Sequence, residues 1–150
     1  MSISNLFSPN DYSLFVKSVS IGNPNDSFDK YVQTGYGNTL TGPFAAPVPI
    51  SAGLYRQLDR TYNLSIAGTS SASTIASPII FGTPLPTTNM WADTYFPIWV
   101  IDNGVTVAGT LHIAFSTGIA TIYVGFNLPF SALGTCGFPG FSVTYGSFLA

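Results

Sequence analysis

Two side chains, each the single one of its type in the chain, are the first candidates for a general base and a thiol nucleophile. They are the single histidine, His112, and the single cysteine, Cys136. A catalytic imidazole needs a nucleophile or an orienting carboxylate beside it, and a reactive thiol needs a basic neighbour that lowers its pKa. No sequence motif supplies such a partner. We therefore expect His112 to be an outward-facing strand residue and Cys136 to be an inert thiol without a disulfide partner in the chain.

Carboxylates are the remaining candidates for acid–base or metal chemistry. The chain has no Glu and six Asp, namely Asp11, Asp26, Asp29, Asp59, Asp93 and Asp102. Asp26 and Asp29 lie in an asparagine-containing loop, but the bidentate acid that completes an EF-hand is missing. No catalytic residue, metal site or cofactor is therefore predicted. A hydrolase would need two carboxylates roughly 5–10 Å apart, and no motif places or excludes such a pair.

Charged side chains are scarce, and this limits the classes of partner. They make up 7% of the chain, with a net charge of −2, against about 25% in an average soluble domain. There is no basic face for phosphate groups, so nucleic-acid binding is not expected. No apolar run approaches about 18 residues, so no membrane insertion is expected. The first residues lack the basic and apolar regions of a signal peptide, so we expect synthesis in a cytosol.

Three side chains are candidates for contacting a ligand: Trp91, Asp93 and His112. An exposed tryptophan can stack on a sugar ring or anchor a protein partner. A carboxylate and an imidazole can hydrogen-bond to the same ligand. The alternatives are packing in the core or at a subunit interface for Trp91, and a strand position that faces solvent or an interface for His112.

A second group of side chains is a candidate for contacts between subunits. Arg56, Asp59 and Arg60 form the densest charge cluster of an otherwise neutral chain. They can form ion pairs across a subunit boundary or plain surface pairs. Trp99, in an aromatic and apolar segment, is expected to pack in the core or at the same kind of boundary.

The hydrophobic segments have the period of strands. Residues 95–101 and 105–115 are apolar or alternating and flank Asn103-Gly104, which is the strongest short-range signal for a hairpin with a type I′ turn. Residues 54–66 also alternate. The side chains expected to face inward are Leu58, Tyr62, Leu64, Ile66, Val105, Val107, Gly109, Leu111, Ile113 and Phe115.

About eight such strands in 150 residues predict an all-β antiparallel sandwich, and their irregular lengths favour a jelly roll. The segment before residue 51 is less regular, and three prolines between residues 39 and 50 favour an edge or a connector. We therefore divide the chain into an N-terminal arm with the first strands, residues 1–50, and a sandwich head, residues 51–150. An apolar, weakly charged surface needs cover, so we expect a closed homo-oligomer.

From residue 55 onward, strand and turn patterns follow one another in a distinctive order. They are Tyr55-Arg56, a Ser/Thr loop, Ile79–Pro86, Tyr95–Val100, Val107–Ile113, Gly118–Tyr123 and Phe141–Tyr145. This order resembles the C-terminal head domains of viral and phage fibres, which implies a trimeric jelly roll of the C1q and tumour-necrosis-factor class. The opening residues 5–12 are similar to the start of short virion proteins of large DNA viruses. The chain departs from the fibre pattern in having no shaft or collagen-like repeat before the head.

The resemblance implies a non-enzymatic structural protein of a virion surface, made in the host cytoplasm and assembled as a homotrimer. Its arm would bind other virion proteins, and loops 69–73, 84–93 and 127–140 would bind a host receptor or glycan with the avidity of three sites. A cellular C1q-like or lectin-like binding module is the alternative. The hydrolase is the third hypothesis.

Overall fold

The described part of the chain consists of strands joined by turns. The computed structural model describes residues 32–56, 61–88 and 90–146. No helix occurs in these ranges, and therefore none that has the length and hydropathy to cross a membrane. The strands are β1 (Val32–Thr41), β2 (Val48–Arg56), β3 (Tyr62–Ile66), β4 (Thr69–Ala72), β5 (Ile79–Phe81), β6 (Thr94–Asp102), β7 (Val105–Ile113), β8 (Ala120–Val124), β9 (Thr135–Phe138) and β10 (Phe141–Tyr145).

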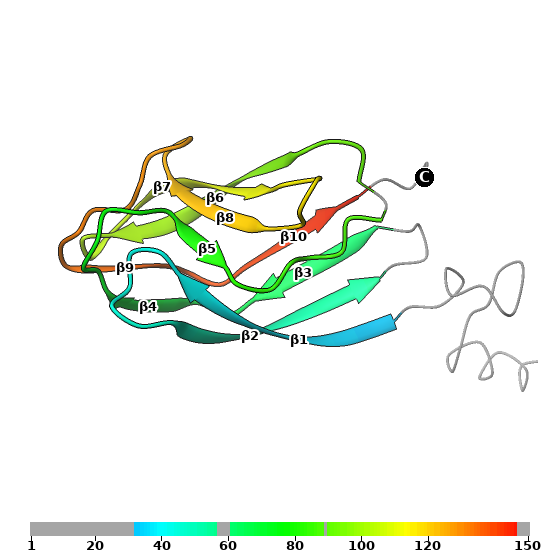
Figure 1. The fold of residues 1–150 in the computed structure, drawn as a ribbon, viewed down its shortest axis with the longest axis horizontal. Coiled ribbons are helices and arrows are strands. Elements are labelled where there is room, and N and C mark those ends of the chain that lie inside the picture. The colour runs from blue at the N-terminus through cyan, green and yellow to red at the C-terminus, as the bar shows by residue number, and fades with distance from the viewer. Residues whose placement is uncertain (1–31, 57–60, 89, 147–150) are drawn as a thin grey trace, which may run out of the picture.

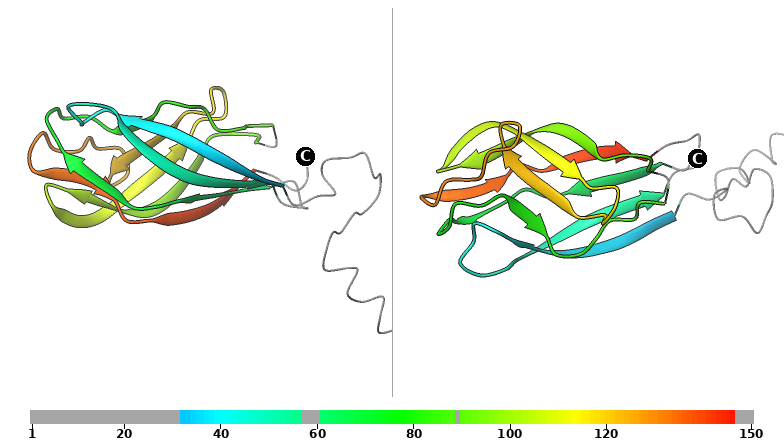
Figure 2. Two further views of the ribbon diagram at one scale, coloured as in Figure 1. Left: turned by 90° about the horizontal axis from the view of Figure 1, so that it is seen from below. Right: turned by 45° about the horizontal axis from the view of Figure 1, so that its top comes forward.

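These strands belong to one antiparallel sheet that curls over on itself. Its order is β10-β3-β2-β1-β5-β8-β7-β6-β9-β4, a sheet of 10 strands. Figures 1 and 2 show β1, β2 and β3 on one side of the molecule and β6, β7 and β8 on the other. Strand β5 joins the two sides because it pairs with β1 and with β8. The all-β, antiparallel prediction is confirmed, with more strands than the expected eight; the jelly-roll connectivity and the homotrimer stay predictions.

Two strands lie where the sequence predicts loops. Strands β4 and β9 are short and rich in Ser, Thr and Gly, and they pair with each other from Thr69–Phe138 to Ala72–Thr135. Their formation depends on close backbone approach, because a Cβ at Gly137 would collide with the Thr69 carbonyl oxygen. Such pairing leaves no hydrophobic period in the sequence. The sequence also predicts strands at residues 12–21 and 28–32, which lie outside the described residues except for Val32, the first residue of β1.

The division of the chain at residue 50 falls inside β2. Strand β1 pairs along the length of β2, so residues 32–41 and 48–50 are part of the sheet, and residues 42–47 connect the two strands. Strand β3 joins β2 only from Ala52 onward. Pro49 therefore lies where β2 has one neighbour, and its missing N–H interrupts no second ladder. The rest of the predicted arm, residues 1–31, lies outside the described residues.

Buried side chains follow the predicted alternation in the middle of the strands and depart from it at the ends. In β7, Leu111 and Ile113 are buried as predicted, whereas Val105 and Phe115 are exposed. Val105 adjoins the hairpin turn and Phe115 follows the last residue of β7, so both lie at the margin of the core. The predicted inward residue Leu58 lies outside the described residues. The largest fully buried side chains are Phe81, Phe130, Phe138, Leu40, Leu64, Ile79, Leu111, Ile113, Ile122 and Val100.

The hairpin between β6 and β7 has the turn that its Asn-Gly pair predicts. Asn103 has a φ of 50° and Gly104 a φ of 77°, the left-handed values that a type I′ turn requires at both central residues. Asp102 pairs with Val105 across this two-residue turn. The turn thereby fixes the register of the longest hairpin on this side of the sandwich.

Replacement of Leu111 by Ala should destabilise the fold strongly. Leu111 is completely buried, so truncation removes apolar contacts and leaves a cavity, at a cost of about 2–5 kcal/mol. The matched control is Val105→Ala on the same strand, where an exposed side chain should cost less than about 0.5 kcal/mol. Chemical denaturation of both variants gives the two values. Equal losses would show that the inward phase assigned to β7 is wrong.

The predicted alternation of β7 is wrong at Thr110. This residue lies between the predicted inward residues Gly109 and Leu111, so the alternation predicts an outward side chain whose truncation has little effect. Thr110 is 7% exposed, and its hydroxyl donates a 2.6 Å hydrogen bond to the Gly125 carbonyl. Thr110→Val keeps the side-chain shape and removes the bond, which should cost about 1–2 kcal/mol of unfolding free energy. The same exchange at exposed Thr106 is the control. A change at position 110 no larger than at position 106 would contradict this assignment.

Candidate ligand-binding face

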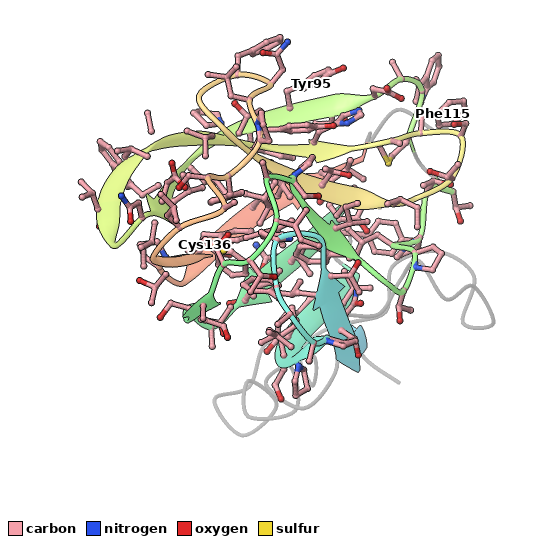
Figure 3. The ribbon with its side chains drawn as sticks, turned by 60° about the vertical axis from the view of Figure 1, so that its left-hand side comes forward. Tyr95, Phe115 and Cys136 are labelled. Carbon is pink, nitrogen blue, oxygen red and sulfur yellow. The ribbon has the colours of Figure 1, made fainter. Side chains whose placement is uncertain are left out.

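The outer face of the β6–β7–β8 layer carries exposed aromatic side chains. Alternate residues of β6, beginning with Tyr95, lie outward and more exposed than their neighbours. The register places Tyr95 opposite His112 and Trp99 opposite Ala108 on β7. Figure 3 shows Tyr95 on the outside of this layer. We refer to Tyr95, Trp99, His112 and Phe126, with Asp93 at one end, as the aromatic face.

Three rings of the aromatic face stack on one another. The Tyr95 ring lies almost parallel to the His112 imidazole, with a centroid distance of 4.6 Å and an interplanar angle of 7°. Phe126, from the turn after β8, stacks on Tyr95 at 5.9 Å and 23°. The turn is fixed above β7 because the Gly125 N–H donates to the Ala108 carbonyl. This leaves the Phe126 ring 70% exposed to solvent, a large apolar surface that the fold itself does not cover.

Asp93, which lies just before β6, orients the His112 imidazole and contacts the backbone just after β7. Its Oδ2 lies 3.0 Å from His112 Nε2, and its Oδ1 accepts a 2.9 Å hydrogen bond from the Phe115 N–H. The Phe115 N–H first, and the His112 hydrogen bond second, lower the pKa of the Asp93 carboxyl below its ordinary value. Asp93 is therefore ionised at neutral pH. Its carboxylate and the imidazole beside it can both hydrogen-bond to ligand hydroxyls.

Trp99 stands between two hollows in the surface. One, of about 230 Å³, is lined by Pro97, Ile98, Trp99, Ala108 and Gly109. The other, of about 200 Å³, extends from the same part of β6 to residues 139–143 at the start of β10. The small side chain of Ala108 leaves room beside the indole, which is 64% exposed. An exposed indole beside an apolar hollow is suited to stacking against the flat apolar face of a ligand.

The free edge of β6 supplies backbone groups next to these hollows. In a hairpin closed by a two-residue turn, Asp102 and Val105 exchange both hydrogen bonds, so every second residue back along β6 directs its backbone away from β7. Ile101 is one of these residues, and it pairs with Gly137 of β9. Counting back by twos from Ile101, the backbone groups of Trp99, Pro97 and Tyr95 also point away from β7. None of these three residues pairs with β9. Their carbonyls and two N–H groups face the space before β10.

Asp102 and Cys136, the other candidates for chemistry among the described residues, have structural roles. Asp102 accepts hydrogen bonds at 2.8 Å from both the backbone N–H and the hydroxyl of Ser131. Asp93 and Asp102 flank β6 at opposite ends, roughly 30 Å apart at the rise of an extended strand, so they are not a hydrolase pair. Cys136 is fully buried, and this burial raises the pKa of its thiol. The described residues contain no group of three metal-ligating side chains.

Two of the three predicted ligand residues are in contact, and the third is near one of them in the sequence. Asp93 and His112 are in direct contact, although 19 positions separate them in the sequence. Trp91 lies two residues before Asp93 and is 68% exposed. Whether these residues bind a ligand stays a prediction.

Most of the predicted inter-subunit residues cannot be placed. Arg56 is the last residue of β2, with a side chain outside the described part, and Asp59 and Arg60 lie outside the described residues altogether. Trp99 is 64% exposed, so the expectation that it packs in the core is wrong, because the outward phase of β6 places its indole on the surface. Its place at a subunit boundary stays a prediction.

Sequence reasoning missed two members of the face, Tyr95 and Phe126. A signal existed for Tyr95, because counting back from the Asn-Gly turn places it opposite His112. Phe126 had none, since it reaches the face through the fold of the turn after β8, which carries no periodic pattern.

No protein-family model matches this chain, and no curated protein matches it. Among solved structures, the chain is similar to the reovirus attachment protein sigma1, crystallised in complex with α-2,3-sialyllactose. The match has a TM-score of 0.44 and 11% sequence identity, and it covers 82% of this chain and 69% of that chain.

The Asp93–Phe115 hydrogen bond should depend on pH. Because the folded-state pKa is lowered from 3.8, the stabilisation is present above that value and is lost as the pH falls through the lowered pKa. We expect the Phe115 amide proton, followed by NMR, to titrate with a midpoint below 3.8. Asp93→Asn should abolish this titration. A midpoint at or above the ordinary value would contradict the geometry.

Proposed function

We propose that the protein is a non-catalytic attachment module of a virion surface, which binds a carbohydrate on its aromatic face. The observation that carries the binding role is the exposed Trp99 indole beside the hollow floored by Ala108. The virion setting is supported by the resemblance of the strand and turn pattern to fibre heads. The residues before β1 are the proposed connection to other virion proteins.

The chemistry of the face suits a sugar better than a reaction. Aromatic rings offer flat apolar surfaces against which the C–H face of a pyranose can lie. The Asp93 and His112 side chains, 3.0 Å apart, and the backbone groups on the free edge of β6 offer hydrogen bonds to ring hydroxyls. A nucleophile beside a base is not part of this arrangement, so binding without turnover is the function that we assign.

Several weak binding sites on one assembly give a higher overall affinity than a single site. A hollow of about 230 Å³ is below the range of about 300–1,000 Å³ typical of sites that enclose a ligand, so one site should bind weakly. A homotrimer presents three sites on one rigid head, and the effective concentration of the second and third sites raises the overall affinity. A trimer would also cover part of the weakly charged surface.

The test is binding of the full chain to a glycan array, with the solution mass measured by light scattering. We expect glycan binding by a species of three times 15.9 kDa. Trp99→Ala should weaken binding at least about tenfold, because the stacked ring loses its partner. Ile75→Ala, which truncates an exposed apolar side chain outside the face, should leave binding unchanged.

A stable monomer would contradict the multivalent part of the proposal. Glycan binding that is indifferent to Trp99→Ala would place the site elsewhere on the molecule. Antibodies raised against the head should label intact particles. Binding without such labelling would favour the cellular lectin-like module.

A further inference from the structure

The aromatic face is built from a part of the chain that contains no fixed positive charge. Residues 61–150 contain neither Lys nor Arg, and the face is assembled from residues 93–126. Its ionised group is Asp93, which is held at one end beside His112. The electrostatic character of the face is thus neutral to negative.

We propose that the ligand of this face is an uncharged saccharide and not a sialylated, sulfated or uronic one. This inference rests on the proposed function and specifies its ligand class. A sugar carboxylate or sulfate needs a cationic or multiple-donor partner to replace the water that it loses on binding. The described residues of the face include no Arg or Lys for that purpose, and the Asp93 carboxylate disfavours a second anion at its end of the face.

The hollow beside Trp99 matches a neutral ring in its polarity. Its lining is Pro97, Ile98, Trp99, Ala108 and Gly109, which has no charged side chain. The indole accepts the C–H face of a pyranose, while the N–H groups of Tyr95 and Trp99 and the carbonyl of Pro97 lie along the free edge of β6. An uncharged hydroxyl can donate to a carbonyl and accept from an N–H, so both kinds of backbone group are used.

Position 93 allows the negative charge of the face to be removed by a substitution of nearly the same size. Asp93→Asn keeps the size of the side chain and an oxygen that can accept from the Phe115 N–H. It removes the negative charge. This variant should raise the affinity for anionic sugars relative to neutral sugars, and an unchanged ratio would contradict the part assigned to the Asp93 charge. The ratio is the quantity compared because Asp93 also offers hydrogen bonds to ring hydroxyls.

The experiment compares matched sugars with and without a charge, using saturation-transfer NMR on the full chain with a panel of lactose, N-acetyllactosamine, α-2,3-sialyllactose and a sulfated lactose. We expect the neutral members to bind at least about tenfold more tightly than the anionic members at low salt. The ratio should shrink in 1 M salt, where the Debye length falls to about 3 Å. Trp99→Ala should remove the transfer signal, and Ile75→Ala should retain it.

The outcomes separate this inference from the proposed function. Tighter binding of the anionic members, still lost in Trp99→Ala, overturns the ligand class and leaves the carbohydrate site in place. Binding of no saccharide overturns the proposed function and the inference together. A fall in solution mass on Trp99→Ala, without any sugar binding, assigns the face to a contact between copies of this chain and likewise overturns both.

Discussion

The register of the β6–β7 hairpin is the constraint from which most of the described arrangement follows. The Asn103-Gly104 turn pairs Asp102 with Val105, and every later pair in the ladder is then determined. A slip of one residue would reverse the faces, moving Leu111 to the surface and Tyr95 into the core. The same register that fills the core therefore also sets out the aromatic face.

The few charges in the described residues act locally and not as ion-pair networks. Asp93 holds the chain beyond β7 through the Phe115 N–H, and Asp102 holds the loop before β9 through Ser131. Each carboxylate stands at one end of β6, so the strand is fixed to its surroundings at both ends. Hydrogen bonds from backbone N–H groups to a carboxylate are stronger than those between neutral groups, which makes two acids sufficient for this purpose.

How far the sequence predicts this molecule depends on whether a feature leaves a local pattern. The fold class, the hairpin and the buried centre of β7 follow from alternation and from one dipeptide. Strands β4 and β9 do not, because both are short and neither sequence alternates between apolar and polar residues. At the candidate site, Asp93 and His112 were predicted but their contact was not, since it depends on the ladder. The stack of Phe126 on Tyr95 arises from a turn in three dimensions and leaves no trace in the sequence.

The proline in β6 has a consequence for the pairing of this strand with a second molecule. An open strand edge invites the edge of a neighbouring molecule, and many proteins prevent this with lysines, which residues 61–150 lack. Pro97 interrupts the row of N–H donors on the free edge of β6, so a foreign strand cannot form a continuous ladder there. Pro97 therefore protects this stretch of β6, while the terminal strands of the sheet are β10 and β4. Where residues 61–150 offer no lysine, backbone chemistry thereby takes the place of electrostatic repulsion in preventing aggregation.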